Sequence, residues 1–85
     1  MKNRVFERGL DLSAERVVLI LYKSEGGFIL ERQLIERDQT VSVQILPIID
    51  LRDLYRFERA DPYSEKLAPL YYEVQRHLRD NRLAE

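Results

Sequence analysis

The feature that most constrains the fold is an unbroken apolar run, Val17–Tyr22. Charged residues precede it, and a pair of glycines, Gly26–Gly27, follows it closely. A short run of this kind, half of it β-branched, is typical of a strand buried on both faces. The sequence therefore predicts a strand at 17–22 that the rest of the chain covers.

A helix over 14–23 is the alternative for this stretch. Ser13 is a suitable N-cap, several apolar residues recur at helical spacing, and Gly26 is placed to end a helix. Leu19 and Ile20 would then make the remaining face of that helix apolar as well, so it would need burial nearly all round. We favour the strand for this reason.

Two further strands are expected after the central one. The conformational freedom of Gly26–Gly27 predicts a tight turn into a second strand at 28–35. Strict alternation of apolar and polar residues predicts a third strand at 40–45, which Pro47 ends or places at a sheet edge. These segments form an antiparallel meander within 16–47.

The third strand is expected to have one apolar and one wet face. Its alternation separates two sets of side chains, Val41, Val43 and Ile45 on one face and Thr40, Ser42 and Gln44 on the other. We expect the polar set to be solvated, with Glu31 and Gln33 of the preceding strand beside it.

Residues 1–13 are the least regular part of the predicted fold. They contain Phe6, Leu10 and Leu12, which is a large apolar surface to leave in water. We therefore expect an extended arm or a short strand, with only the first four residues frayed. The pattern leaves open whether this segment packs on its own chain or exchanges with a second copy.

The period changes to that of a helix after the third strand. Asp50 is a favourable N-cap, and apolar residues at helical spacing predict a helix of about ten residues that Asp61–Pro62 closes. The clearest amphipathic pattern in the chain follows, between Leu67 and Leu78. Pro69 interrupts this pattern early, so either the second helix restarts near Pro69 after one turn at 62–67 or a single helix is kinked there, and we favour the restart.

Together these elements predict a single α+β domain over 1–85. Its antiparallel meander is three-stranded, or four-stranded if the first residues add a strand. Two C-terminal helices within 50–81 are expected to pack on one face of this sheet. The 45% apolar content agrees with a folded domain, although its length makes the margin of stability thin.

The composition excludes several classes of function. The 14 basic and 15 acidic residues nearly cancel, so no net field attracts nucleic acid or an anionic membrane. With no cysteine and one histidine, disulfides, thiol catalysis and the usual zinc sites are excluded within one chain. No apolar run approaches the ~18 residues of a membrane span, and no apolar stretch of a signal peptide follows the N-terminus. We therefore predict a cytoplasmic protein without cofactor or metal.

The first predicted helix carries a row of arginines, Arg52, Arg56 and Arg59, at helical spacing. Such a row can bind phosphates, which makes a nucleic-acid-associated regulator the alternative function. Acidic residues lie among the arginines and neutralise much of that potential, so pairing with an acidic protein partner is favoured. Tyr63 and Tyr72 fall off the apolar stripe of the second helix and are expected to be exposed anchors at the same kind of interface.

Catalytic candidates are few. Asp50 and Asp53 are three residues apart, as paired carboxylates for acid–base chemistry or a divalent metal would be. A helix cap at Asp50 and a favourable first-turn charge at Asp53 explain both residues equally well. His77 has Tyr63 or Glu73 as a conceivable acid–base partner, but no spacing supports the pair. We predict that the chain is not an enzyme.

The clearest functional hint is the second face of the predicted central strand. This face is apolar too, and so short a chain has few elements left to cover it. We therefore expect a second copy or a different protein to cover it. The favoured function is a small non-enzymatic interaction or regulatory module that forms a homodimer.

Overall fold

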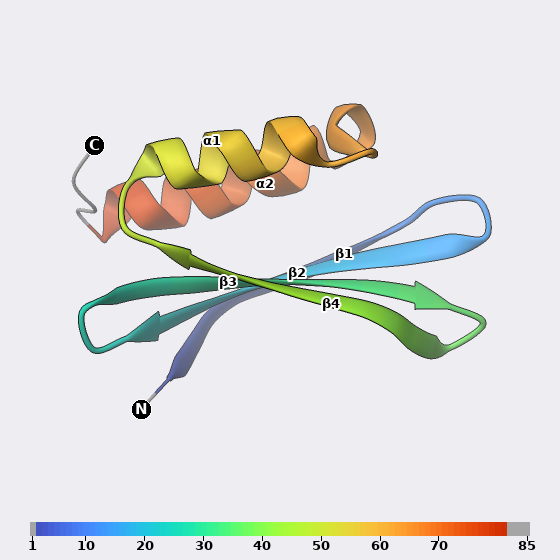
Figure 1. Ribbon diagram of the computed structural model, residues 1–85, viewed down its shortest axis with the longest axis horizontal. Coiled ribbons are helices and arrows are strands. Elements are labelled where there is room, and N and C mark those ends of the chain that lie inside the picture. Colours follow the sequence, from blue (N-terminus) through green and yellow to red (C-terminus); the bar gives the residue numbers. More distant parts are fainter. Residues whose placement is uncertain (1, 82–85) are drawn as a thin grey trace.

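Four antiparallel strands follow one another along the chain and pair in the same order, β1-β2-β3-β4. The computed structural model describes residues 2–81, and Figure 1 shows two helices after the sheet, both on the same side of it. The elements are β1 (Asn3–Asp11), β2 (Glu15–Ser24), β3 (Gly27–Glu36), β4 (Gln39–Ile48), α1 (Leu51–Ala60) and α2 (Ser64–Asp80). The predicted α+β class, with its antiparallel meander and two C-terminal helices, is confirmed, and the sheet has the fourth strand.

The apolar run lies in β2, which is an inner strand of the sheet. Its residues Val17, Leu19 and Leu21 are fully buried beneath the helices. Val18 and Ile20 point to the opposite face and are also buried. The strand predicted at 17–22 is therefore confirmed, and the helical alternative is wrong.

Two-residue turns connect β2 to β3 and β3 to β4. In the first turn Gly26 has a φ of 87°, a conformation that glycine adopts without a steric penalty from Cβ. In the second turn Arg37 and Asp38 have φ values of 52° and 63°. Positive φ at both central residues is typical of the type I′ turn, whose twist matches that of antiparallel strands. The tight turn predicted after the central strand is confirmed, and a second one joins β3 to β4 within the predicted meander.

The first residues form a full strand rather than a short one. β1 pairs with β2 of the same chain from Asn3 opposite Lys23 to Asp11 opposite Arg16, with a register shift between Arg4 and Phe6. Asn3 and Arg4 are therefore paired in β1, so the fraying expected of them is wrong. This segment packs on its own chain.

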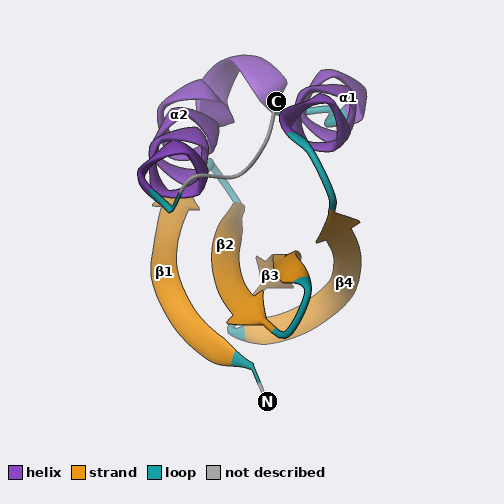
Figure 2. Ribbon diagram, turned by 90° about the vertical axis from the view of Figure 1, so that its left-hand side faces the viewer, coloured by secondary structure: helices purple, strands orange, loops and turns teal. Residues whose placement is uncertain are grey.

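Both helices lie on one face of the sheet, α2 above β1 and α1 above β4 (Figure 2). Asp50 caps α1 as predicted, because its side chain accepts the N–H groups of Arg52 and Asp53. Asp53 in turn accepts the N–H of Asp50, which completes a capping box.

Pro69 lies inside α2, which runs without a break from Ser64 to Asp80. The expected restart at Pro69 is therefore wrong. The ring removes one backbone donor near the start of the helix, where the carbonyl that would have accepted it belongs to the exposed Glu65. That carbonyl can bond to water, so the helix tolerates the proline.

The polar and apolar faces of β4 are the reverse of the expectation. Ser42 and Gln44 pair with Leu34 and Arg32, which lie on the same side as the helices. Val43 and Ile45 pair with Gln33 and Glu31 on the other side. The alternation of this strand was thus predicted, and Thr40 and Gln44 are exposed as expected, but the apolar set Val43 and Ile45 faces away from the core.

A bulge also separates Val41 from the other apolar residues of β4. Val41 has no partner on β3, because the pairing passes from Thr40 opposite Ile35 to Ser42 opposite Leu34. It lines a hollow with Glu36 and Gln39 instead. An extra residue of this kind breaks the two-residue period of a strand, so Val41 does not share a face with Val43 and Ile45.

Candidate functional site

We call the sheet face opposite the helices the open face. No element among residues 2–81 lies on it (Figure 2). Its side chains come from every second residue of the three strands that carry its apolar surface, namely Val18, Ile20 and Tyr22 in β2, Ile29, Glu31, Gln33 and Ile35 in β3, and Val43 and Ile45 in β4.

The middle of the open face is already shielded by the chain itself. Ile20 is only 5% exposed and lies between Glu7 and Glu31 in the ladder. Val18 is 7% exposed and lies beside Gly9, whose missing Cβ leaves space that the guanidinium of Arg16 occupies. Long polar side chains therefore cover the apolar centre of this face.

The exposed apolar surface lies instead on β4. Val43 and Ile45 are 51% and 61% exposed, although both belong to regular strand. β4 contains no charged residue between Gln39 and Ile48, whereas β1, the opposite edge of the sheet, carries Arg4, Glu7, Arg8 and Asp11. Native sheets usually protect edge strands with charges, so an uncharged edge with exposed Val and Ile is a candidate interaction surface.

The backbone of β4 also presents free pairing groups. Leu12 and Glu15 exchange both backbone hydrogen bonds, and this fixes which residues of each strand bond to which neighbour. Hydrogen-bonded and non-hydrogen-bonded pairs alternate along each antiparallel ladder. Followed from β1 to β4, this alternation directs the backbone N–H and C=O groups of Ser42, Gln44 and Leu46 toward β3. The outward residues are therefore Val43, Ile45 and Pro47, of which Pro47 has no N–H to offer.

A bulge and a proline delimit this stretch. The bulge at Val41 lies on one side of it and Pro47 on the other. Only Val43 and Ile45 offer both an outward N–H and an outward C=O between these limits. We call the outer side of Val43–Ile45, with the side chains it carries, the β4 edge.

On the other side of the sheet, a buried ion pair joins β3 to the connection between the helices. Arg32 donates from Nε and Nη2 to the two carboxylate oxygens of Asp61, at 2.8 and 2.9 Å. The hydroxyl of Tyr71 donates to the same carboxylate at 2.6 Å, and the backbone N–H of Tyr63 does so at 2.9 Å. Arg32 also donates to the side chain of Gln44 on β4 at 3.3 Å.

Burial and hydrogen bonding compete in setting the pKa values of this cluster. Burial alone would raise the pKa of Asp61, but the hydrogen bonds from Arg32 and Tyr71 outweigh it and hold that pKa below its usual value. Burial likewise opposes the charge of Arg32, yet Asp61 raises the pKa of the guanidinium. Burial and the hydrogen bond to Asp61 both raise the pKa of Tyr71 far above its usual range.

Every buried side-chain nitrogen and oxygen in the described part of the chain has a hydrogen-bond partner. The cluster is thus a closed network with no group left to bind a ligand. Its role is to hold the connection between α1 and α2 against the sheet.

The arginine row lies on the solvent side of α1, as its spacing predicted. Arg52 contacts the capping residue Asp50 at 3.3 Å, and Arg56 contacts Asp53 at 3.8 Å. First-turn carboxylates therefore neutralise part of the row, which weakens the support for nucleic-acid binding. That function stays a prediction.

The two predicted tyrosine anchors differ in exposure. Tyr72 is 58% exposed on α2, in agreement with the expectation. Tyr63 is half-buried, because its ring packs against the core and its hydroxyl donates to Glu15 at 2.6 Å. The expected exposure of Tyr63 is therefore wrong, and its contribution to an interface is a prediction that the geometry does not favour.

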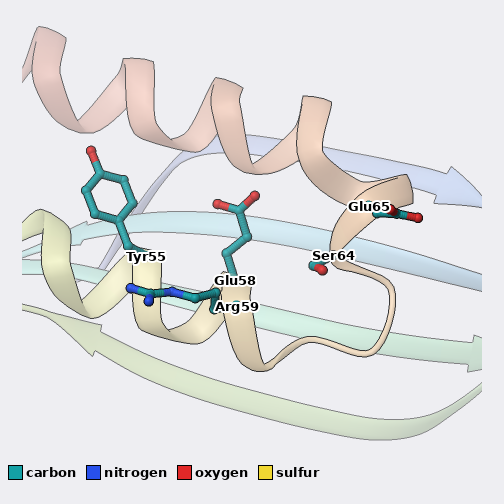
Figure 3. A pocket seen from close by; sticks show the side chains of 5 residues that line it. All are labelled: Tyr55, Glu58, Arg59, Ser64 and Glu65. Carbon is teal, nitrogen blue, oxygen red and sulfur yellow. The ribbon is translucent and has the colours of Figure 1, made fainter.

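A hollow of ≈ 360 Å³ lies between α1 and the first turn of α2 (Figure 3). Tyr55 and Glu58 extend from α1 toward α2, while Arg59 runs back along α1. Burial, and to a smaller extent the charge of Asp61, raises the pKa of Glu58. The remaining lining residues are Ser64 and Glu65, and the hollow is wide open to solvent, unlike the enclosed clefts that hold most small-molecule ligands.

The other catalytic candidates have structural partners. Asp50 and Asp53 form the capping box, and hydrogen bonds from the N–H groups of Ile49 and Asp50 lower the pKa of Asp53. The ring of His77 lies 5.1 Å from that of Phe6 on β1. Among residues 2–81, no group of three or more histidine or acidic side chains is arranged to hold a metal ion. No helix in this range is long and apolar enough to cross a membrane.

Comparison with protein-family models, with curated proteins and with solved structures found no match to this chain. The candidate site therefore rests on the geometry of the chain alone. Within that geometry, the β4 edge is the one surface in the described residues that joins exposed apolar side chains to free backbone pairing groups.

Proposed function

We propose that this chain is a small non-enzymatic protein-interaction module that associates with a second copy through the β4 side of its open face. The observation that carries the proposal is the exposure of Val43 and Ile45, 51% and 61%, on a strand without charged residues. Burying such side chains against a like surface is favourable, at about 25 cal/mol for each Å² removed from water.

A like surface suits β4 better than most other partners do. Two copies of an uncharged strand meet without bringing like charges together, and a closed two-fold arrangement uses the same patch on both chains. No cofactor takes part in this function. The size of the chain supports it as well, because a domain of 85 residues gains a large fraction of its stability from any additional burial.

The solution mass of the Ile45→Lys variant tests the proposal. Because a charge at the β4 edge would have to be desolvated on association, the variant is expected to dissociate at concentrations where the wild type is a dimer of 10.2 kDa chains. The expected weakening is about tenfold or more in the dissociation constant, corresponding to at least about 1.4 kcal/mol. Light scattering over a concentration series measures it.

Tyr72→Lys is the matched control, because it places the same charge at a similarly exposed position on α2. It is expected to leave the dimer intact. A dimer that survives Ile45→Lys but dissociates with Tyr72→Lys would move the interface to the helices and contradict the proposal.

A further inference from the structure

We propose that the second copy joins at the β4 edge itself, as an antiparallel β4–β4 pair whose two-fold axis passes through Gln44. The two four-stranded sheets then form one continuous eight-stranded sheet. This inference rests on the proposed function and adds the mode and register of the association. It differs from the stacking of two open faces, in which the strand edges stay free.

The backbone of β4 selects this register. In an antiparallel pair, residues that bond to each other must both direct their N–H and C=O groups toward the partner. Val43 and Ile45 are the outward residues with both groups, so Val43 pairs with Ile45 of the second copy and Ile45 with its Val43. Gln44 then lies opposite Gln44 of the second copy, on the axis.

The bulge at Val41 and the proline at 47 fit the same register. Val41 and Pro47 lie at equal distances in sequence on either side of Gln44, so the pairing places Pro47 opposite the bulge residue of the other chain. Regular hydrogen bonding is already interrupted at a bulge, and the missing N–H of Pro47 therefore costs no bond there. Because of the two-fold axis, each end of the paired segment has Val41 of one chain opposite Pro47 of the other.

The side chains agree with the backbone. On the open face the pairing brings Val43 next to Ile45 of the second copy, so each exposed apolar side chain gains an apolar neighbour on the adjoining strand. On the helix side, the oxygen of Gln44 accepts from Arg32, which leaves its amide nitrogen available to the Gln44 it faces. No charged side chain of β4 lies in the pair.

The opposite edge of the sheet does not offer an equivalent site. β1 is charged along its length, and its Arg8 is bonded to Glu73 of α2 at 2.7 Å. It also contains a register shift between Arg4 and Phe6. Self-pairing at that edge would bring charges of β1 together, which is the usual protection of an edge strand. The inference therefore commits to β4.

A single introduced cysteine tests the register, because the chain has no cysteine of its own. On the axis, Gln44 lies in a non-hydrogen-bonded pair, in which the Cα atoms are about 4.5 Å apart. That distance is within the range of a disulfide. The Gln44→Cys variant is expected to form a covalent dimer on mild oxidation at micromolar concentration.

Ser42→Cys is the matched control on the same strand and the same side of the sheet. In the proposed register its two copies lie four residues apart along the pair, about 13 Å, which is too far for a disulfide. Cross-linking of Gln44→Cys is expected to be at least about tenfold faster. Equal rates for the two variants, in a protein whose reduced form is dimeric, would overturn the register.

The outcomes separate this inference from the proposed function. If Ile45→Lys dissociates the dimer while Gln44→Cys fails to cross-link, the open face binds a second copy by stacking, and only the edge pairing is wrong. If the wild type stays monomeric at every concentration, both are wrong, and the β4 edge is left to an extended segment of a different protein.

Discussion

The Asp61→Asn variant is expected to unfold with a free energy about 3–5 kcal/mol lower than that of the wild type. The side chain of Asp61 is 1% exposed and that of Arg32 is 7% exposed, so the substitution leaves a buried guanidinium without its counter-charge. The substitution also replaces one carboxylate oxygen with an NH2 group, so two hydrogen-bond donors, this group and an N–H of Arg32, face each other. Urea-induced unfolding at pH 7 measures the difference.

The double variant Arg32→Met/Asp61→Asn is the control for this prediction. It removes both charges, while the amide still serves the two contacts made by different carboxylate oxygens: its oxygen accepts from the N–H of Tyr63 and its NH2 group donates to the hydroxyl oxygen of Tyr71. Replacing both partners of a buried pair is often nearly neutral, so most of the loss is expected to be recovered. A single variant as stable as the wild type would show that the ion pair does not hold the helices to the sheet.

The same ion pair gives the protein an acid-sensitive component of stability. Because the pKa of Asp61 is lower in the folded chain than its ordinary value of 3.8, the folded state binds this proton less readily than the unfolded state does. The contribution is therefore complete above about pH 5 and is lost as the pH falls through the folded-state pKa. The double variant is expected to lose less stability than the wild type over this range.

The Leu19→Ala variant is expected to lose about 2–5 kcal/mol of unfolding free energy. Leu19 is fully buried on the inner strand β2, beneath both helices, so truncation removes apolar contacts and leaves a cavity. Ile49→Ala is the comparison, because Ile49 is 81% exposed and its truncation is expected to change stability by about 0.5 kcal/mol or less. Chemical denaturation of both variants at one protein concentration tests the difference, and similar losses would contradict the central place of β2.

The parts of the fold that sequence reasoning predicted are those set by local chemistry. The apolar run Val17–Tyr22 and the following glycines determined a strand and a turn without reference to distant residues. The capping box at Asp50 was likewise readable, because its partner Asp53 lies three residues away. The effect of Pro69 was misjudged. The free energy that a proline costs a helix depends on whether the carbonyl four residues before it can bond to water, and a local sequence pattern does not give the exposure of that carbonyl.

The orientation of β4 was misjudged for a different reason. Alternation separates two sets of residues but does not say which set faces the helices. The signal was present further along the strand, because Leu46 and Ile48 have the same parity as Ser42 and Gln44. Ile48 is 2% exposed, so residues of its parity face the core. Val43 and Ile45 have the other parity and face away from it.

The ion pair was missed because its members are 29 residues apart. Along β3, Arg32 has the same parity as Phe28, Leu30 and Leu34, and a charge on such an apolar face requires a buried partner. Asp61 had been explained by its position at the end of a helix. Only the packing of the helices on the sheet brings the two together.

Amide hydrogen exchange at Val43 and Ile45 tests the β4 pairing most directly. In a monomer these N–H groups point away from β3 into water and should exchange almost unprotected, whereas that of Gln44 is bonded within the sheet and provides the internal control. We expect both amides to be protected at concentrations where the solution mass is that of a dimer, and to lose protection on dilution or with Ile45→Lys. Unprotected amides at Val43 and Ile45 in a dimeric solution would contradict the pairing of this strand.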